Sequence, residues 1–154
     1  MIGPYGSAIE LYVTRFSGLG YLKSSDTDYE VVFSNGAYRV SFSTEKYYHP
    51  SVAVTLIDST GAKFVMAFVR EILAPAQFAK ELEELKGVRS RYHLDGQGTD
   101  KDTWAAGIEA YMSLIVEHVC SFLSALGGDK FTADETFLTR YRELERARLK
   151  PFGL

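Results

Sequence analysis

The stretch that decides the fold runs from Tyr29 to Phe42 and reads YEVVFSNGAYRVSF. Apolar and polar residues alternate on both sides of Asn35-Gly36, a pattern typical of two antiparallel strands joined by a tight turn. A two-residue turn centred on Asn35 and Gly36 places all the apolar partners on one face of the hairpin and leaves the other face largely polar. The predicted partners on the apolar face are Phe33 with Tyr38, Val31 with Val40 and Tyr29 with Phe42.

A second hairpin is predicted between residues 52 and 68, where apolar residues again alternate. A three-residue loop, Ser59-Thr60-Gly61, suits this hairpin because such loops end on a residue in the left-handed conformation, which glycine accepts. A two-residue loop would place an apolar residue opposite a charged one. The expected pairs are Leu56 with Phe64 and Val54 with Met66, and Phe68 continues the second strand.

Helical spacing occupies both ends of the chain. Four apolar residues near the start predict one face of a short helix, with Ser7 as its N-cap and Gly18 as its end. In the second half we expect helices over 74–87, 101–126 and 133–149, the first of them ended by Gly87, and a long loop over 88–100. The apolar residues of the first helix are Ile9, Tyr12, Val13 and Phe16.

The central helix carries an apolar stripe from Trp104 to Leu126, yet its opposite side is small and weakly polar. An exposed helix would normally carry Lys and Glu on that side. We therefore expect this helix to be buried on two sides, between the sheet and the helix over 133–149. The small or weakly polar residues are Ala106, Ala110, Ser113, Leu114, Ser121 and Ala125.

Together these elements predict a single α+β domain over residues 1–154. A chain of 154 residues is ordinary for one domain. The expected architecture is a short N-terminal helix, an antiparallel sheet of four to five strands built from two hairpins, and three C-terminal helices covering one face.

Composition restricts the function classes. The net charge of −3 argues against a nucleic-acid binder, which usually carries a basic excess. A single cysteine, Cys120, excludes an intrachain disulfide and a multi-cysteine metal site, and we expect it to be a buried apolar residue. No signal peptide or membrane-spanning run is recognisable, so we expect a cytoplasmic protein with no cofactor, no metal and no membrane partner.

Four titratable residues raise the alternative of acid–base chemistry. His93 and Asp95 lie in the predicted long loop, and Glu117 and His118 lie on the central helix. If they converged in one cleft between sheet and helices, the protein could bind or hydrolyse a small molecule. Their spacing matches no metal signature, and no glycine-rich phosphate loop is present.

A surface for a protein partner is the other interpretation. The segment from Glu45 to Pro50 places two tyrosines and a histidine in the connection between the hairpins, and tyrosine is enriched at interfaces. The alternative is that these tyrosines only pack on the sheet edge or face solvent. The candidate partner-binding residues are Glu45, Tyr47, Tyr48, His49, Tyr92, His93 and Asp95.

The stretch from Leu19 to Ile72 resembles small bacterial α+β proteins that accompany polymorphic or contact-delivered toxins, a group that includes immunity proteins. The segments that carry the resemblance are Tyr29–Phe33, Tyr38–Phe42 and Val52–Leu56. The resemblance implies a non-catalytic cytoplasmic protein that neutralises a toxin, such as a basic one, by protein–protein contact. It carries over no functional residue. A homodimer formed through the sheet face or the long helix is a further alternative.

Overall fold

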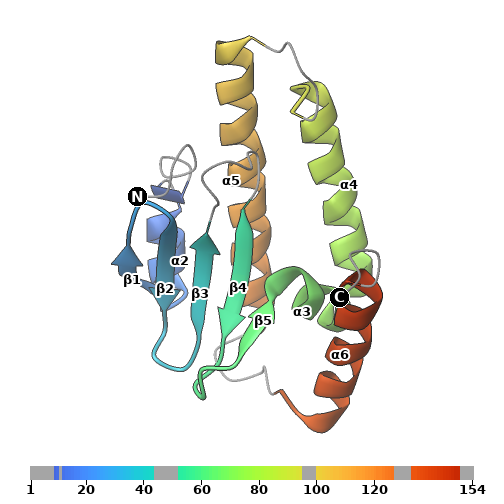
Figure 1. The fold of residues 1–154 in the computed structure, drawn as a ribbon. Helices are drawn as coiled ribbons and strands as arrows, with labels where there is room; N and C mark the ends of the chain where they lie inside the picture. Colours follow the sequence, from blue (N-terminus) through green and yellow to red (C-terminus); the bar gives the residue numbers. More distant parts are fainter. Residues whose placement is uncertain (1–8, 11, 44–51, 95–99, 127–132, 150–154) are drawn as a thin grey trace.

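The computed structural model describes residues 9–10, 12–43, 52–94, 100–126 and 133–149. It is an α+β structure with one antiparallel sheet and helices on one face (Figure 1). The predicted fold class is therefore confirmed.

The sheet has five strands in sequence order, so each strand pairs with the next along the chain. Every pairing is antiparallel. The five strands are β1 (Leu22–Asp26), β2 (Glu30–Ser34), β3 (Arg39–Ser43), β4 (Ala53–Ile57) and β5 (Lys63–Val65).

The first hairpin forms, but its register differs by two residues from the prediction. Val31 pairs with Phe42 and Phe33 with Val40. The turn centres on Gly36 and Ala37 because the Asn35 side-chain oxygen accepts the N–H groups of Ala37 and Tyr38, at 2.9 and 2.7 Å. Only Gly36, at φ +92°, has a positive φ in this turn.

A shift of two residues keeps every side chain on its predicted face. Val31, Phe33, Val40 and Phe42 all lie in the core, as the alternation requires. Tyr29 is the exception: it precedes β2 and is 53% exposed, because Val31 takes its place opposite Phe42.

The second hairpin confirms the predicted three-residue loop. Leu56 pairs with Phe64, and Gly61 has φ +88°. The expected pair of Val54 with Met66 does not form, because β5 ends at Val65 and helix α3 begins at Met66. The alternating residues of this segment also fit a helix, since Met66, Val69 and Arg70 are buried three and four residues apart.

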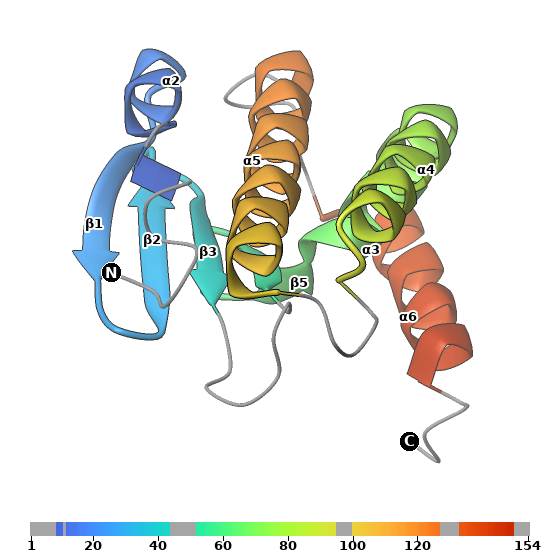
Figure 2. The same ribbon diagram turned by 90° about the horizontal axis from the view of Figure 1, so that it is seen from above.

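The helices lie on one side of the sheet or beside it. In Figure 1, α2 and α5 lie behind the sheet and α4 flanks α5, and the same arrangement is seen from above in Figure 2. Helix α5 has the bounds that the sequence predicts. The helices are α2 (Val13–Gly18), α3 (Met66–Leu73), α4 (Pro75–Arg91), α5 (Lys101–Leu126) and α6 (Glu135–Leu149).

Aromatic rings join the helices to the sheet at two places. Under α2, the ring of Phe16 stacks on Phe33 with centroids 4.4 Å apart, and both rings meet Phe42 edge to face. At the other end, Tyr141 of α6 packs on Phe64, and its hydroxyl accepts the Val65 N–H at 2.8 Å. These contacts bury side chains of α2 and α6 that the helical spacing marks as apolar.

The predicted neighbour of α5 is wrong. Helix α5 packs against α4, whereas α6 packs against α3. The small side of α5 is only partly covered: Ala106 and Ser121 are exposed, and Ala110 is half-buried. The stripe on α5 indicates how much of the helix is buried, but it does not identify the helix that covers it.

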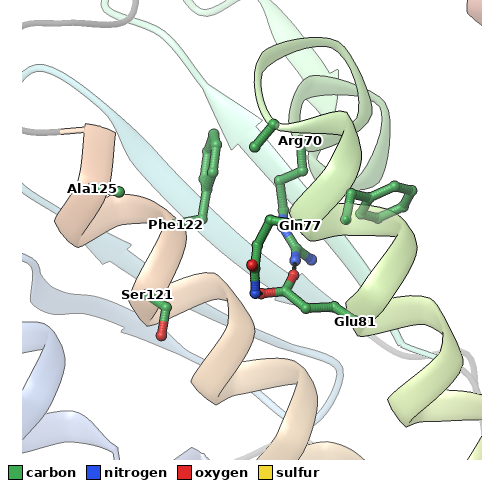
Figure 3. Close-up of a pocket in the computed structure, with 8 residues that line it drawn as sticks. Arg70, Gln77, Glu81, Ser121, Phe122 and Ala125 are labelled. Carbon is green, nitrogen blue, oxygen red and sulfur yellow. Dashed lines mark hydrogen bonds and ion pairs between the residues drawn. The ribbon is translucent and has the colours of Figure 1, made fainter.

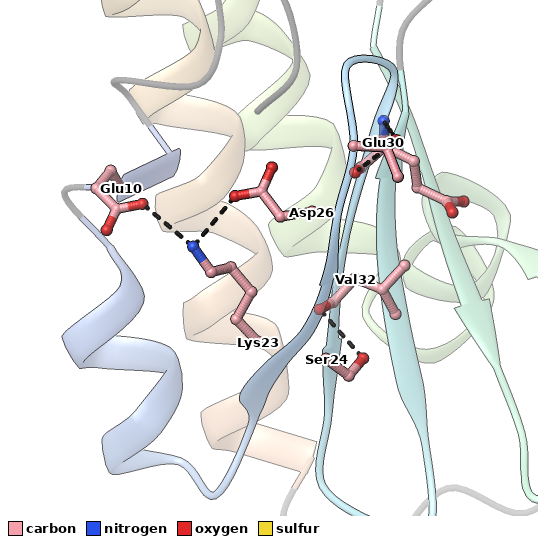
Figure 4. Close-up of polar contacts among 7 residues, drawn as sticks. Glu10, Lys23, Ser24, Asp26, Glu30 and Val32 are labelled. Atoms are coloured by element: carbon pink, nitrogen blue, oxygen red, sulfur yellow. Dashed lines mark hydrogen bonds and ion pairs between the residues drawn. The ribbon is translucent and has the colours of Figure 1, made fainter.

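Polar contacts tie the N-terminal segment to the edge strand. The Lys23 ammonium lies 3.2 Å from a carboxylate oxygen of Asp26 and 3.6 Å from one of Glu10 (Figure 4). Ser24 lies where the register between β1 and β2 shifts, and its hydroxyl donates to the backbone carbonyl of Val32 at 3.3 Å. Because these charges are solvated, we expect them to contribute little stability.

Candidate functional site

A buried ion pair lies where α3, α4 and α5 meet. Arg70 of α3 is paired with Glu81 of α4, and both residues are less than a tenth exposed. The Gln77 side chain donates to the other oxygen of Glu81 at 3.0 Å (Figure 3). The Arg70 guanidinium also lies 5.2 Å from the ring centroid of Phe78. Burial lowers the pKa of Arg70 to about 10, so the guanidinium is still cationic at neutral pH.

The ion pair lines a cavity of about 350 Å³ between α4 and α5. Figure 3 shows Gln77 reaching toward α5 and Phe122 standing between the two helices. The α5 side carries no charged or amide group, so the charged and amide groups of the lining come from α3 and α4. The lining residues are Arg70, Ala74, Gln77, Phe78, Glu81, Ser121, Phe122 and Ala125.

A second cavity, of about 230 Å³, lies between β4 and the helices α4 and α5. Its walls are mostly apolar, and include Val54 from the sheet, Leu85 from α4 and Ile115 from α5. Arg70 and Phe78 line this cavity as well as the first. The two cavities are therefore adjacent, and they meet at Arg70 and Phe78.

His118 extends the polar interface along α5. Its imidazole Nε2 lies 3.1 Å from a carboxylate oxygen of Glu84 on α4, and the residue is buried. Nδ1 is buried without a hydrogen-bond partner among the described residues. Burial is the main cause that lowers the pKa of His118; the nearby Arg70 charge also lowers it, and the bond to Glu84 opposes them.

The lowered pKa predicts that stability falls in acid. Between the folded pKa of His118 and the unfolded value of about 6.5, the unfolded chain binds more protons, so the free energy of unfolding decreases as pH falls through this window. Urea unfolding at several pH values checks this, with His118→Gln as the comparison. We expect the variant to lose part of the dependence below pH 6.5; an identical dependence in both proteins would contradict the assignment.

Two of the predicted partner-binding residues lie in the described structure. Tyr92 is half-buried against the core, and His93 is exposed. Both follow the end of α4, which continues through Gly87 to Arg91 and so shortens the predicted loop. The other predicted residues, Glu45, Tyr47, Tyr48, His49 and Asp95, lie outside the described residues.

His93 ends α4 in place of the expected Gly87. Its φ is 54°, and it is the one non-glycine residue with a positive φ among those described. The Leu94 N–H donates to the Arg89 carbonyl at 3.0 Å and the His93 N–H to the Ser90 carbonyl at 3.3 Å. This is the Schellman motif, which usually places glycine at that position because other residues are strained there.

We expect His93→Gly to be more stable than His93→Ala by about 1 kcal/mol, since only glycine relieves the left-handed backbone. Both variants remove the same side-chain contacts, so their difference isolates the strain. Urea unfolding of the two variants measures it. Equal stabilities would show that the motif does not persist in solution.

The alternative of an acid–base site is not supported by the geometry of its members. His93 lies between Tyr92 and Leu94, which contact the position of Gly107 on α5. Eleven residues of helix, about 16 Å, separate that position from His118. Glu117 is exposed, and Asp95 lies outside the described residues. The structure therefore does not bring His93 and His118 together.

Cys120 is a core residue, as predicted. It is buried, and burial raises the pKa of its thiol to about 11. The described residues contain no group of three or more His, Cys, Asp or Glu that could hold a metal ion.

Comparison with known proteins finds no matching family model, no significant curated relative and no significantly similar solved structure. Within the described chain, α5 is the one helix whose length and composition would suffice to cross a membrane, a property that core helices share.

Arg70, Gln77 and Glu81 line the first cavity but are not among the site residues predicted from the sequence. A signal for two of them exists in the helical spacing: Arg70 follows Val69 on the buried side of α3, and Glu81 lies three residues after Phe78. A charged residue at a core-facing helical position requires a buried partner. That requirement could have predicted the pair, although not the cavities beside it.

Proposed function

We propose that the protein is a non-catalytic binding protein that holds a small, largely apolar molecule between the sheet and helices α4 and α5. The observation that carries this proposal is the pair of adjacent cavities that share Arg70 and Phe78. Small-molecule sites are typically concave, mostly apolar and roughly 300–1,000 Å³ in volume, with a few polar groups that fix orientation. The first cavity lies in this range, and the second extends it beneath β4.

The titratable groups near the cavities support binding over catalysis. The imidazole of His118 is already in contact with the Glu84 carboxylate, and the raised pKa of the Cys120 thiol disfavours the nucleophilic thiolate. A general acid or base needs hydrogen-bond reach to a reacting group. Arg70 and Glu81 instead form an ion pair with each other.

The experiment uses the neutral fluorophore N-phenylnaphthylamine, which brightens in apolar surroundings, with the parent and two variants. Ala125→Phe places a ring in the first cavity, which Ala125 lines from an exposed position on α5. Ser124→Phe is the matched control, because Ser124 is exposed on the same helix and lines neither cavity.

We expect the parent and Ser124→Phe to bind the fluorophore and Ala125→Phe to bind it at least tenfold more weakly. Absence of binding to the parent, or equal binding by all three proteins, would contradict the proposal.

A protein partner is the second candidate, supported by the exposed His93 that a strained backbone holds at the end of α4. On this proposal Tyr92 and His93 contribute to an interface, as in the immunity-type proteins that the sequence resembles. The test is purification from the native host with parent and His93→Glu proteins. A stoichiometric partner retained by the parent and lost by the variant supports it; equal retention would argue against this surface.

A further inference from the structure

Arg70 lines both cavities and carries the one cationic side chain among their lining residues. Glu81 meets it from one side, while the second oxygen of Glu81 is taken by Gln77. One oxygen of the carboxylate therefore faces Arg70 and the other faces Gln77.

The Arg70 guanidinium has five N–H donors, and within the described parts of the chain Glu81 is the one acceptor assigned to it. Arg70 is only 7% exposed, so bulk solvent reaches little of it. Because Arg70 lines both cavities, a ligand that supplies a further acceptor there gains a hydrogen bond to a charged donor, which is stronger than one between neutral groups.

Charge restricts what that acceptor can be. Arg70 and Glu81 neutralise each other, and His118 beside them has a lowered pKa. A ligand with a full charge of either sign would remain uncompensated in a buried site, which is unfavourable. An uncharged acceptor avoids this cost.

We infer that the ligand is an uncharged aliphatic molecule with a carbonyl group. The carbonyl oxygen accepts an N–H of Arg70 at the junction, and the chain fills the apolar cavity lined by Val54, Leu85 and Ile115. This inference rests on the proposed function and adds to it the chemical class of the ligand.

The test compares four probes of similar length in competition with N-phenylnaphthylamine: octane, methyl heptyl ketone, octanoate and octylamine. We expect the ketone to compete at least tenfold better than octane, because it adds one hydrogen bond to a charged donor. Octanoate and octylamine, charged at neutral pH, should compete at least tenfold less well than the ketone.

A double variant, Arg70→Met with Glu81→Met, tests the role of the guanidinium. Apolar replacement of a buried ion pair is often neutral for folding. We expect octane to bind as in the parent and the advantage of the ketone to disappear. If this variant does not fold, the four-probe series on the parent still decides the inference.

Three results would overturn the inference. Octanoate as the strongest competitor would show that the ion pair opens for an anion, and octylamine as the strongest would show that Glu81 takes a cation. Equal competition by ketone and octane would show that Arg70 accepts no ligand group. If the fluorophore itself does not bind the parent, the proposed function fails instead.

Discussion

Replacing Glu81 by methionine is expected to lower the free energy of unfolding by about 3 kcal/mol, the lower end of the range for breaking a buried ion pair. The change leaves the Arg70 guanidinium buried and without its carboxylate. We expect the lower end because water in the adjacent cavity can solvate part of the charge. Stabilities of small domains are about 5–15 kcal/mol, so this loss is a large fraction of the whole.

The double variant with Arg70→Met separates the cost of an orphaned charge from the value of the pair. We expect it to recover most of the lost stability, since two methionines leave no charge to desolvate. As a matched single change, Glu83→Met removes an exposed carboxylate of the same helix and should alter stability by less than about 0.5 kcal/mol. Urea unfolding monitored by circular dichroism measures all three. A Glu81→Met protein as stable as Glu83→Met would show that the pair is not buried in solution.

The second large effect is expected at Gly107, where α5 approaches the end of α4. A Cβ at this position would lie 2.5 Å from the Tyr92 Cβ and 2.8 Å from the Leu94 Cδ2. Overpacking of this kind costs about 1–3 kcal/mol, and the better helix propensity of alanine returns about 1 kcal/mol. Because the closest contact is with a Cβ, which no rotamer change can move, we expect the upper part of this range, about 2–3 kcal/mol, and Gly107→Ala to lower the free energy of unfolding by about 1–2 kcal/mol in total.

Gly87 supplies the control for this prediction. It also lies within a helix, but a Cβ there would meet nothing within 4 Å. Gly87→Ala should raise the free energy of unfolding by about 0.5–1 kcal/mol, so the two substitutions have opposite signs. If both stabilise the protein, the Tyr92–Leu94 segment does not pack against α5.

Gly87 and Gly107 show how far the role of a glycine can be predicted from the sequence. A glycine near the end of an apolar stripe favours a helix end, and on that basis the sequence predicts that Gly87 ends the helix. The structure places the end at His93 instead, because two backbone hydrogen bonds close the Schellman motif there. Whether a glycine ends a helix or admits a neighbour depends on tertiary contacts, which local spacing does not contain.

The sheet was predictable because its faces depend on a period of two. The turn lies one residue later than predicted because the Asn35 side chain accepts backbone N–H groups. Val31 and Val40 nevertheless lie on the predicted core face. The helix α3 was not predictable in the same way, since Met66 fits both alternating and helical spacing. Similarly, the stripe of α5 predicts burial but not that α4, rather than α6, packs beside it.

The candidate site was predictable only in part. From the sequence, a pocket between sheet and helices is one alternative, but the residues predicted for it are His93, Asp95, Glu117 and His118. The residues around the first cavity come from three separate helices and the turn between two of them, and Arg70 and Glu81 belong to no recognisable motif. Their buried pairing is the feature that distinguishes them from the many exposed charges of the chain.

Intermolecular nuclear Overhauser effects between methyl heptyl ketone and the isotope-labelled protein locate the bound ligand. We expect contacts from the ketone to Ala125 and Phe122 in the first cavity and to Val54 and Leu85 in the second. Contacts confined to surface residues outside both cavities, or none at saturating ketone, would contradict the proposal.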